Sequence, residues 1–151
     1  MTTYEEVYNT PFGVCTIIFH HNTIHALKFY GDSIVAIDDP EFIDQIFNKD
    51  SVNIPIYIEG TEFQRKVWEA ARKIPFGTTA TYSDIAVMIN HPRAVRAVGT
   101  ALGNNKIAYI IPCHRIVSKS SDALNYRWGG HVKKALLAWE KNVLDTESKL
   151  I

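Results

Sequence analysis

The strongest constraint on the fold of this chain is a succession of short helix signals between residues 60 and 104. Thr61 followed by Gln64, and Thr81 followed by Asp84, each have the spacing of an N-terminal capping box, in which two side chains satisfy the first free backbone amides of a helix. Apolar side chains recur at helical spacing after each box. These residues therefore predict at least two short helices in close succession.

Two breaks divide this part of the chain into three predicted helices. Pro75-Phe76-Gly77 ends the first helix, and Asn90-His91-Pro92 separates the second from the third. Proline suits the first turn of a helix, so we expect the third helix to begin at Pro92 and to end at about Leu102. Its buried face is predicted to consist of Val95, Val98 and Leu102. Two short helices joined by a tight turn in a basic segment indicate a helix-turn-helix.

Residues 1–58 have a different character. β-Branched and aromatic residues at 14–19 and 24–30, with turns at 8–13 and 21–23, predict a hairpin or meander. A short helix is expected from Asp39 to Phe47, and a further strand at 54–58. We therefore expect an α/β (α+β) chain with a scaffold domain over 1–58, formed by a small antiparallel sheet with a helix. A helical, winged-helix-like DNA-binding domain is expected over 59–151.

Two further elements are predicted around the second cysteine of the chain. Residues 107–111 are apolar and indicate a short buried strand that Pro112 ends, so Cys113 is the first residue beyond it. Periodic apolar residues predict a last helix from His131 to Glu140, and we expect the residues after Asn142 to be frayed.

Charge is distributed unevenly along a chain whose formal net charge is zero. Residues 1–60 contain nine acidic and two basic side chains, whereas residues 91–134 contain eight basic and one acidic. The basic segment could form a phosphate-binding surface or could pair with the acidic part, and charge alone favours neither. No apolar stretch approaches the ~20 residues of a membrane span. The two cysteines, Cys15 and Cys113, are expected to be free thiols rather than a disulfide.

Cys113 is the candidate nucleophile. It lies in the segment Ile111-Pro112-Cys113-His114-Arg115, where adjacent cationic side chains are expected to lower the thiol pKa. His114 is a candidate base, acting directly or through a bridging water, and a carboxylate elsewhere could orient it. The alternative is that Cys113 is a small buried apolar residue. For Glu140, near the end of the last helix, the alternative is an ordinary solvated glutamate.

Several segments of the chain together resemble one family. Ile111–Val117 is similar to the active-site signature of the O6-alkylguanine-DNA alkyltransferases, also called methylated-DNA–protein-cysteine methyltransferases. The resemblance covers about residues 60–140 strongly and residues 1–58 more weakly. The other segments that carry it, in the same order as in the family, are Thr10–Gly13, Ile74–Gly77 with Thr81-Tyr82, Arg93–Gly99, Gly103–Asn105, Asn125–Gly129, and Lys133 with Leu136–Glu140.

The resemblance implies a role for each matching residue. Cys113 would accept the alkyl group, His114 would be its base through a water, and Glu140 would orient His114. Tyr82 would donate a hydrogen bond to the leaving guanine, and Asn105 would hold the turn before the active site. The residues implied in DNA binding are Arg96, which would fill the space of the extruded base, and Arg93, Thr81, Thr100 and Arg115. The base pocket would be formed by Tyr126, Arg127, Trp128 and Lys133.

The same resemblance implies the reaction and the partner. The substrate would be double-stranded DNA with O6-alkylguanine, or O4-alkylthymine as a second possibility, and the nucleotide would be flipped out of the duplex because O6 is otherwise inside the base stack. Alkyl transfer to Cys113 would be irreversible, so each molecule would act once, without a cofactor. We expect a monomer in the compartment that holds the genome: the cytoplasm of a prokaryote, or the nucleus of a eukaryote.

Some residues depart from the family pattern or leave alternatives open. The loop 120–125 lacks the glycines common before the tyrosine, which bears on the alkyl groups that fit. Some relatives hold a structural zinc; here His20 and His25 have no convincing further ligands, so no metal is expected. Tyr82 could be a core residue of its helix, and Arg96 an ordinary exposed arginine. The alternative functions are a Cys-His-Glu hydrolase of small molecules, a non-catalytic binder of alkylated DNA, and a transcriptional sensor switched by alkylation.

Overall fold

The computed structural model describes residues 3–30, 36–119 and 126–149. The chain begins with an antiparallel meander of β1 (Thr3–Thr10), β2 (Gly13–His20) and β3 (Thr23–Lys28), in the order β1-β2-β3. The predicted meander is confirmed, but the turn predicted at 8–13 is shorter, because residues up to Thr10 pair with β2. His21 and Asn22 have positive φ angles of 49° and 62°, as a tight hairpin turn requires.

One helix packs on this sheet. Helix α1 (Pro40–Ile46) begins after Asp39, whose side chain accepts a hydrogen bond from the Phe42 amide, and the ring of Phe42 stacks on Tyr8 at 4.9 Å. A single 3-10 turn, η2 (Ser51–Asn53), follows. Residues 54–58 do not form the predicted strand; they make one isolated bridge, from Ile56 to Ile24.

The next part of the chain forms α2 (Glu62–Arg72), α3 (Tyr82–Met88) and α4 (Val95–Gly103). Both predicted capping boxes are present, at Thr61 with Gln64 and at Thr81 with Asp84. Helix α4 begins three residues later than predicted, because Pro92 lies in the turn and Ala94 is the N-cap. Val98 and Leu102 are buried as expected, but Val95 is 36% exposed because it lies in the first turn of the shortened helix.

The segment before Cys113 differs most from the prediction. Residues 107–111 are fully buried but make only one isolated bridge among the described residues, from Ile107 to Leu27, and Tyr109 has a φ angle of +69°. That backbone angle is incompatible with a strand. Cys113 then begins the short helix η3 (Cys113–Arg115), and β5 (Ile116–Val117) pairs in parallel with β4 (Ala80–Thr81).

The last helix, α5 (Gly130–Ser148), is longer than predicted. The expectation of a frayed segment after Asn142 was wrong, because two contacts hold that part of the helix. Glu147 forms an ion pair with Lys49 at 2.7 Å. Leu144 packs so closely on Gly77 (φ +82°) that a Cβ atom there would overlap with Leu144 Cδ1. Gly77 is therefore needed both for its backbone angle and for the approach of α5.

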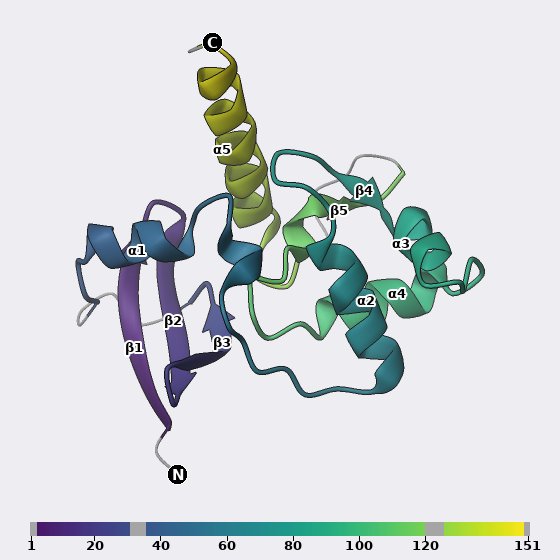
Figure 1. Cartoon of the computed structure of the whole chain (residues 1–151), viewed down its shortest axis with the longest axis horizontal. Helices are drawn as coiled ribbons and strands as arrows, with labels where there is room; N and C mark the ends of the chain where they lie inside the picture. The colour runs from purple at the N-terminus through teal and green to yellow at the C-terminus, as the bar shows by residue number, and fades with distance from the viewer. Residues whose placement is uncertain (1–2, 31–35, 120–125, 150–151) are drawn as a thin grey trace.

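Figure 1 shows the sheet and α1 on one side of the molecule and α2, α3 and α4 on the other, with the C-terminal half of α5 projecting beyond them. One cluster of buried apolar residues includes residues from both sides of position 58, and the Phe47 and Tyr109 rings lie 4.8 Å apart. A domain division at residues 58 and 59 therefore stays a prediction. No helix in the described part of the chain is long and apolar enough to cross a membrane.

Candidate active site

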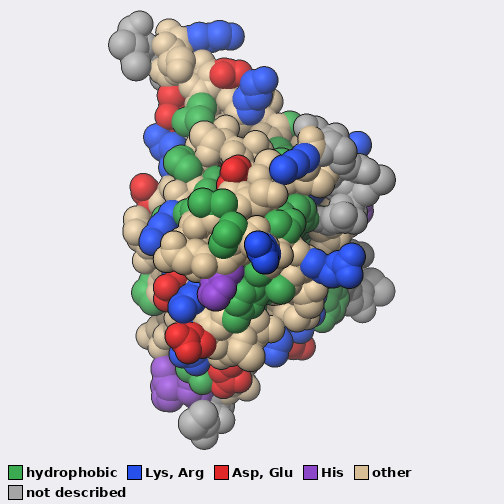
Figure 2. Space-filling model, turned by 90° about the vertical axis from the view of Figure 1, so that its right-hand side faces the viewer, with side chains coloured by type: hydrophobic (Ala, Val, Ile, Leu, Met, Phe, Trp, Pro, Cys, Tyr) green, Lys and Arg blue, Asp and Glu red, His purple; other side chains and the backbone are tan. Residues whose placement is uncertain are grey.

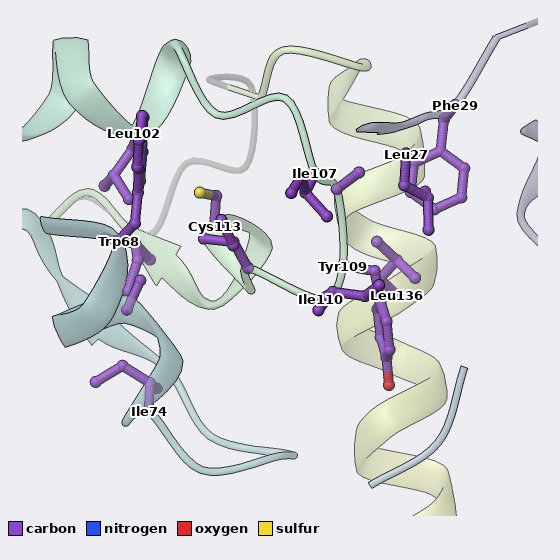
Figure 3. Close-up of a cluster of buried hydrophobic side chains, with 14 of the residues drawn as sticks. Leu27, Phe29, Trp68, Ile74, Leu102, Ile107, Tyr109, Ile110, Cys113 and Leu136 are labelled. Carbon is purple, nitrogen blue, oxygen red and sulfur yellow. The ribbon is translucent and has the colours of Figure 1, made fainter. Parts of the chain in front are cut away.

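Cys113 lies at the centre of the candidate site. Figure 3 shows it between Leu102 of α4 and Ile107, with its sulfur atom turned toward the α4 side. The residue is 7% exposed, and its Sγ atom accepts a hydrogen bond from Asn105 Nδ2 at 3.2 Å. The same amide donates to the carbonyls of Ile107 and Ile111, and its oxygen accepts from the Ile107 amide at 2.8 Å. Asn105 therefore fixes both the backbone of the buried segment and the thiol at its end.

A buried network of three side chains lies beside the thiol. Glu140, from the middle of α5, is fully buried and lies 2.6 Å from His114 Nε2. Arg115 donates to the same carboxylate from Nε and Nη2, at distances of 2.9 to 3.2 Å. The Gly77 amide donates to Glu140 Oε1 at 2.9 Å. A carboxylate that accepts this many hydrogen bonds is held in one orientation.

The electrostatics of this network define the state of His114. Burial lowers the pKa of His114, outweighing the hydrogen bond that His114 donates to Glu140, so the imidazole is neutral. Burial alone would raise the pKa of Glu140, but the hydrogen bonds from His114 and Arg115 and the positive charge of Arg115 outweigh it, and the pKa is lowered. A neutral imidazole beside a carboxylate donates from Nε2, which leaves the lone pair on Nδ1. Among the described residues this buried Nδ1 atom has no hydrogen-bond partner. It is the atom available to accept a proton.

The expectation that adjacent cations lower the thiol pKa was wrong. Burial raises the pKa of Cys113 to about 12, although the hydrogen bond from Asn105 and the charge of Lys133 act in the opposite direction. The cations are engaged elsewhere, since Arg115 neutralises Glu140 and His114 is uncharged. Cys113 is therefore a thiol at rest, and its proton would have to leave for the sulfur to act as a nucleophile.

The structure also corrects the expectation that Arg115 contacts DNA. Its side chain is 1% exposed, and besides the contacts with Glu140 it donates from Nη1 to the Ile74 carbonyl at 2.9 Å. A guanidinium buried on these partners has no surface to offer a phosphate. Lys133, predicted for the base pocket, is likewise 1% exposed and donates to the Ile116 carbonyl at 2.6 Å. It is not among the residues that line the pocket at the Cys113 thiol.

A pocket of about 220 Å³ opens onto the thiol. Burial raises the pKa of Tyr82 and of Tyr126, so both phenols keep their protons and can donate. In the part of the chain that is described, the buried Tyr126 hydroxyl has no partner. Arg127 donates to the Asn105 carbonyl at 2.8 Å, and its guanidinium lies 5.5 Å from the Trp128 ring centre. The residues that line the pocket are Tyr82, Gly99, Leu102, Gly103, Cys113, Tyr126, Arg127 and Trp128. The loop 120–125 lies outside the described residues.

The predicted DNA-contacting residues lie mainly on α4 and just before it. Arg93, Arg96 and Thr100 are exposed and line a shallow hollow with the start of α2. Thr81 differs from them, because its side chain accepts the capping hydrogen bond of α3. Figure 2 shows the side of the molecule that carries these helices, where hydrophobic side chains gather in the middle and Lys and Arg side chains lie around them, together with some Asp and Glu side chains. Such a face is compatible with a polyanion.

No metal centre accompanies this site in the described residues. Within 3–30, 36–119 and 126–149, no group of three or more His, Cys, Asp or Glu side chains is placed to hold an ion. The rings of His20 and His25 lie 5.2 Å apart at the far end of the sheet.

The fold and the site together define a class of protein in which a helix-turn-helix is followed by a buried cysteine beside a His–Glu pair. The family model described as "6-O-methylguanine DNA methyltransferase, DNA binding domain" matches residues 62–142. The chain belongs to this O6-methylguanine DNA methyltransferase family.

Individual relatives agree with this assignment. The chain is 53% identical over 89 residues to the probable methylated-DNA–protein-cysteine methyltransferase of Acanthamoeba polyphaga mimivirus, covering 59% of each chain. It resembles the crystal structure of Mycobacterium tuberculosis O6-methylguanine methyltransferase, with a TM-score of 0.78 and 33% identity over 93% of this chain and 94% of that one. The M. tuberculosis OGT protein in complex with DNA gives a TM-score of 0.77 at 33% identity, over 91% of this chain and 92% of the other. The chain spans about half the length of the curated relatives it matches, between 46% and 59% for three of them.

Two features of the site were not predicted from the sequence. The use of Arg115 as a partner of Glu140 depends on a contact between positions 25 residues apart, and nothing local to Arg115 indicates it. Tyr109 stacks on His114 at 5.3 Å, but it occurs in a run of apolar residues that indicated only a buried strand.

Proposed function

We propose that this chain repairs DNA by moving an alkyl group, typically methyl, from O6 of guanine to the Sγ atom of Cys113. The observation that carries the proposal is a thiol that lines a pocket together with two tyrosines, next to a His–Glu pair whose second ring nitrogen has no partner among the described residues. Family membership and the names of the relatives support the same reaction. The substrate would be duplex DNA, and the protein would act as a monomer.

The proposed reaction is a displacement at the alkyl carbon. The Cys113 proton passes to His114 Nδ1 through a water, and the resulting imidazolium is stabilised by Glu140. The sulfur forms a bond to the alkyl carbon while the bond from carbon to guanine O6 breaks, and its electron pair remains on guanine. Tyr82, a protonated donor, would stabilise that charge and assist protonation of the leaving base.

The product explains why each molecule would act once. A thioether has no acidic proton and is a poor leaving group, and the described residues that line the pocket include no second thiol to remove the alkyl group. No cofactor is required, because both the acceptor and the proton carrier belong to the chain.

The pocket requires that the nucleotide leave the duplex. Flipping costs a few kcal/mol, and a side chain inserted into the duplex offsets part of that cost. Arg96 would have this role, and small neighbours on α4 would let the helix approach DNA closely. Arg93 and Thr100 would contact phosphates and contribute salt-dependent affinity without reading sequence.

The test of the proposed function is the intact mass of the protein after reaction with excess duplex DNA that contains O6-methylguanine. One added methyl group, mapped to Cys113 and never exceeding one per chain, is the expected result. Tight binding without a mass change would instead indicate a non-catalytic binder. Repeated turnover of small esters or amides without a mass change would indicate a hydrolase.

Replacing Arg96 by alanine is expected to slow repair of duplex DNA by roughly tenfold or more, since an inserted side chain offsets part of a flipping cost of a few kcal/mol. Transfer from the free base O6-benzylguanine, which needs no flipping, should keep its rate. Transfer rates from both substrates, measured in parallel, give the result. The matched control is Lys134→Ala, which removes an exposed cation from α5. Equal slowing on duplex and free base would contradict a role in flipping.

A further inference from the structure

Tyr109 lies between the N-terminal part of the chain and the candidate base. Its side chain is fully buried, and its ring is stacked on the imidazole of His114 with centroids 5.3 Å apart and planes inclined by 13°. Phe47, next to the end of α1, contacts the Tyr109 ring with centroids 4.8 Å apart. The Tyr109 hydroxyl donates to the Asn48 carbonyl at 2.9 Å. The Tyr109 side chain therefore contacts the candidate base, His114, and is held by Phe47 and Asn48, which lie 62 and 61 positions earlier in the chain.

The backbone of Tyr109 supports a role for its side chain. Its φ angle is +69°, in the left-handed region that bulky aromatic residues rarely adopt. Surrounding packing must hold a residue in such a conformation. This left-handed backbone angle places the Tyr109 ring against His114. In an extended strand, successive side chains would instead point alternately to opposite faces.

We propose that Tyr109 is a positioning residue for His114, and that through it residues 47 and 48 contribute to the reactivity of Cys113. The part that concerns rate rests on the proposed alkyl transfer. Two contacts hold the imidazole of His114. Glu140 accepts a hydrogen bond from Nε2, and the stacked Tyr109 ring prevents the imidazole from rotating about that hydrogen bond. Together they define where the free Nδ1 atom lies. The same π face also favours the imidazolium that forms when the thiol proton arrives, because a cation within about 6 Å of a ring centre is attracted to it.

Two substitutions distinguish the role of the Tyr109 ring from that of its hydrogen bond to Asn48. Tyr109→Met removes the ring while a flexible side chain fills much of its space, and Tyr109→Phe keeps the ring but removes the bond to Asn48. At saturating DNA, we expect the rate constant for transfer to fall roughly tenfold in Tyr109→Met and about threefold in Tyr109→Phe. The dissociation constant for duplex DNA should not change, because Tyr109 has no exposed surface.

The matched controls are Tyr8→Met and Tyr8→Phe. Tyr8 is also buried and packs on an aromatic ring, Phe42, within the same apolar cluster, but that contact is in the sheet and α1. These variants should lose comparable stability and keep the wild-type rate. Slowing by the same factor in the Tyr8 variants would show that rate follows general stability, and would overturn the proposal.

A second readout does not depend on alkyl transfer. The ¹⁵N spectrum of histidine-labelled protein reports the tautomer and mobility of His114. We expect a single species protonated at Nε2 in the wild type and in Tyr109→Phe, and a mixed or broadened signal in Tyr109→Met. If the wild type transfers no methyl group, the proposed function fails, and the spectra alone decide the role of Tyr109. A wild-type spectrum together with a wild-type rate in Tyr109→Met would overturn the proposal.

Discussion

Replacing Cys113 by serine is expected to abolish alkyl transfer completely while leaving duplex binding in place. A serine hydroxyl fits the space and can still accept the hydrogen bond from Asn105, but its proton is far harder to remove than that of a thiol. The exposed α4 residues proposed to contact DNA are not touched by the change. Intact mass after reaction with methylated duplex, and a binding titration of the same duplex, measure the two properties separately.

The second cysteine provides the control. Cys15 is fully buried in β2, and burial raises its pKa to about 12, as for Cys113. The two thiols therefore have similar intrinsic acidity in the folded chain, and they differ in the pocket and in the base beside them. Cys15→Ser should transfer one methyl group at the wild-type rate. Residual methylation of Cys113→Ser at Cys15, or loss of duplex binding in Cys113→Ser, would contradict this separation of roles.

Replacing Glu140 by glutamine is expected to lower both stability and activity. The change leaves the Arg115 guanidinium buried without its counter-charge, and breaking a buried ion pair in this way costs about 3–5 kcal/mol. It also removes the charge that stabilises the imidazolium of His114, so transfer should slow by on the order of a hundredfold or more. Thermal or urea unfolding measures the first effect, and single-turnover kinetics on the fraction that remains folded measure the second.

The same carboxylate makes stability depend on pH. The pKa of Glu140 is lower in the folded protein than in the unfolded chain, so its contribution is fully present above the unfolded pKa of about 4.3. The contribution is lost as pH falls through the lower folded value, and the Glu140→Gln variant should show less of this acid sensitivity. Glu147→Gln, on the same helix but in an exposed pair with Lys49, should change the unfolding midpoint little. Equal decreases of the unfolding midpoint in the two variants would show that the buried network stabilises the protein no more than the exposed ion pair does.

Local signals were sufficient for much of the fold. Both capping boxes were predicted because their partners lie three residues apart and the geometry is set within one turn. The limits of α4 and α5 were less well predicted. Helix α4 begins at Val95 because the tight turn extends through Pro92, and α5 continues to Ser148 because Leu144 and Glu147 find partners at Gly77 and Lys49. Such tertiary contacts carry no local signature.

The same difference between local signals and tertiary contacts applies to the candidate site. The resemblance of residues 111–117 to one family pointed to Cys113, and the structure brings His114 and Glu140 into contact as that resemblance implied. The acidity of the thiol was predicted in the wrong direction, because adjacent sequence reveals neither the burial that raises the pKa of Cys113 nor that Arg115 turns inward to Glu140. The stacking of Tyr109 required a left-handed backbone angle that an apolar run does not predict.

The placement of Glu140 on the last helix has a consequence for the order of events during synthesis. A nascent chain that has emerged as far as residue 130 already contains the thiol and the imidazole. It lacks the carboxylate that selects the imidazole tautomer and the counter-charge that allows Arg115 to be buried. His114 therefore gains its carboxylate partner only when α5 docks against Gly77 and the η3 turn. If Cys113 is the alkyl acceptor, as proposed, the thiol and the complete His–Glu pair are therefore assembled in one site only after the last helix has been made and has docked.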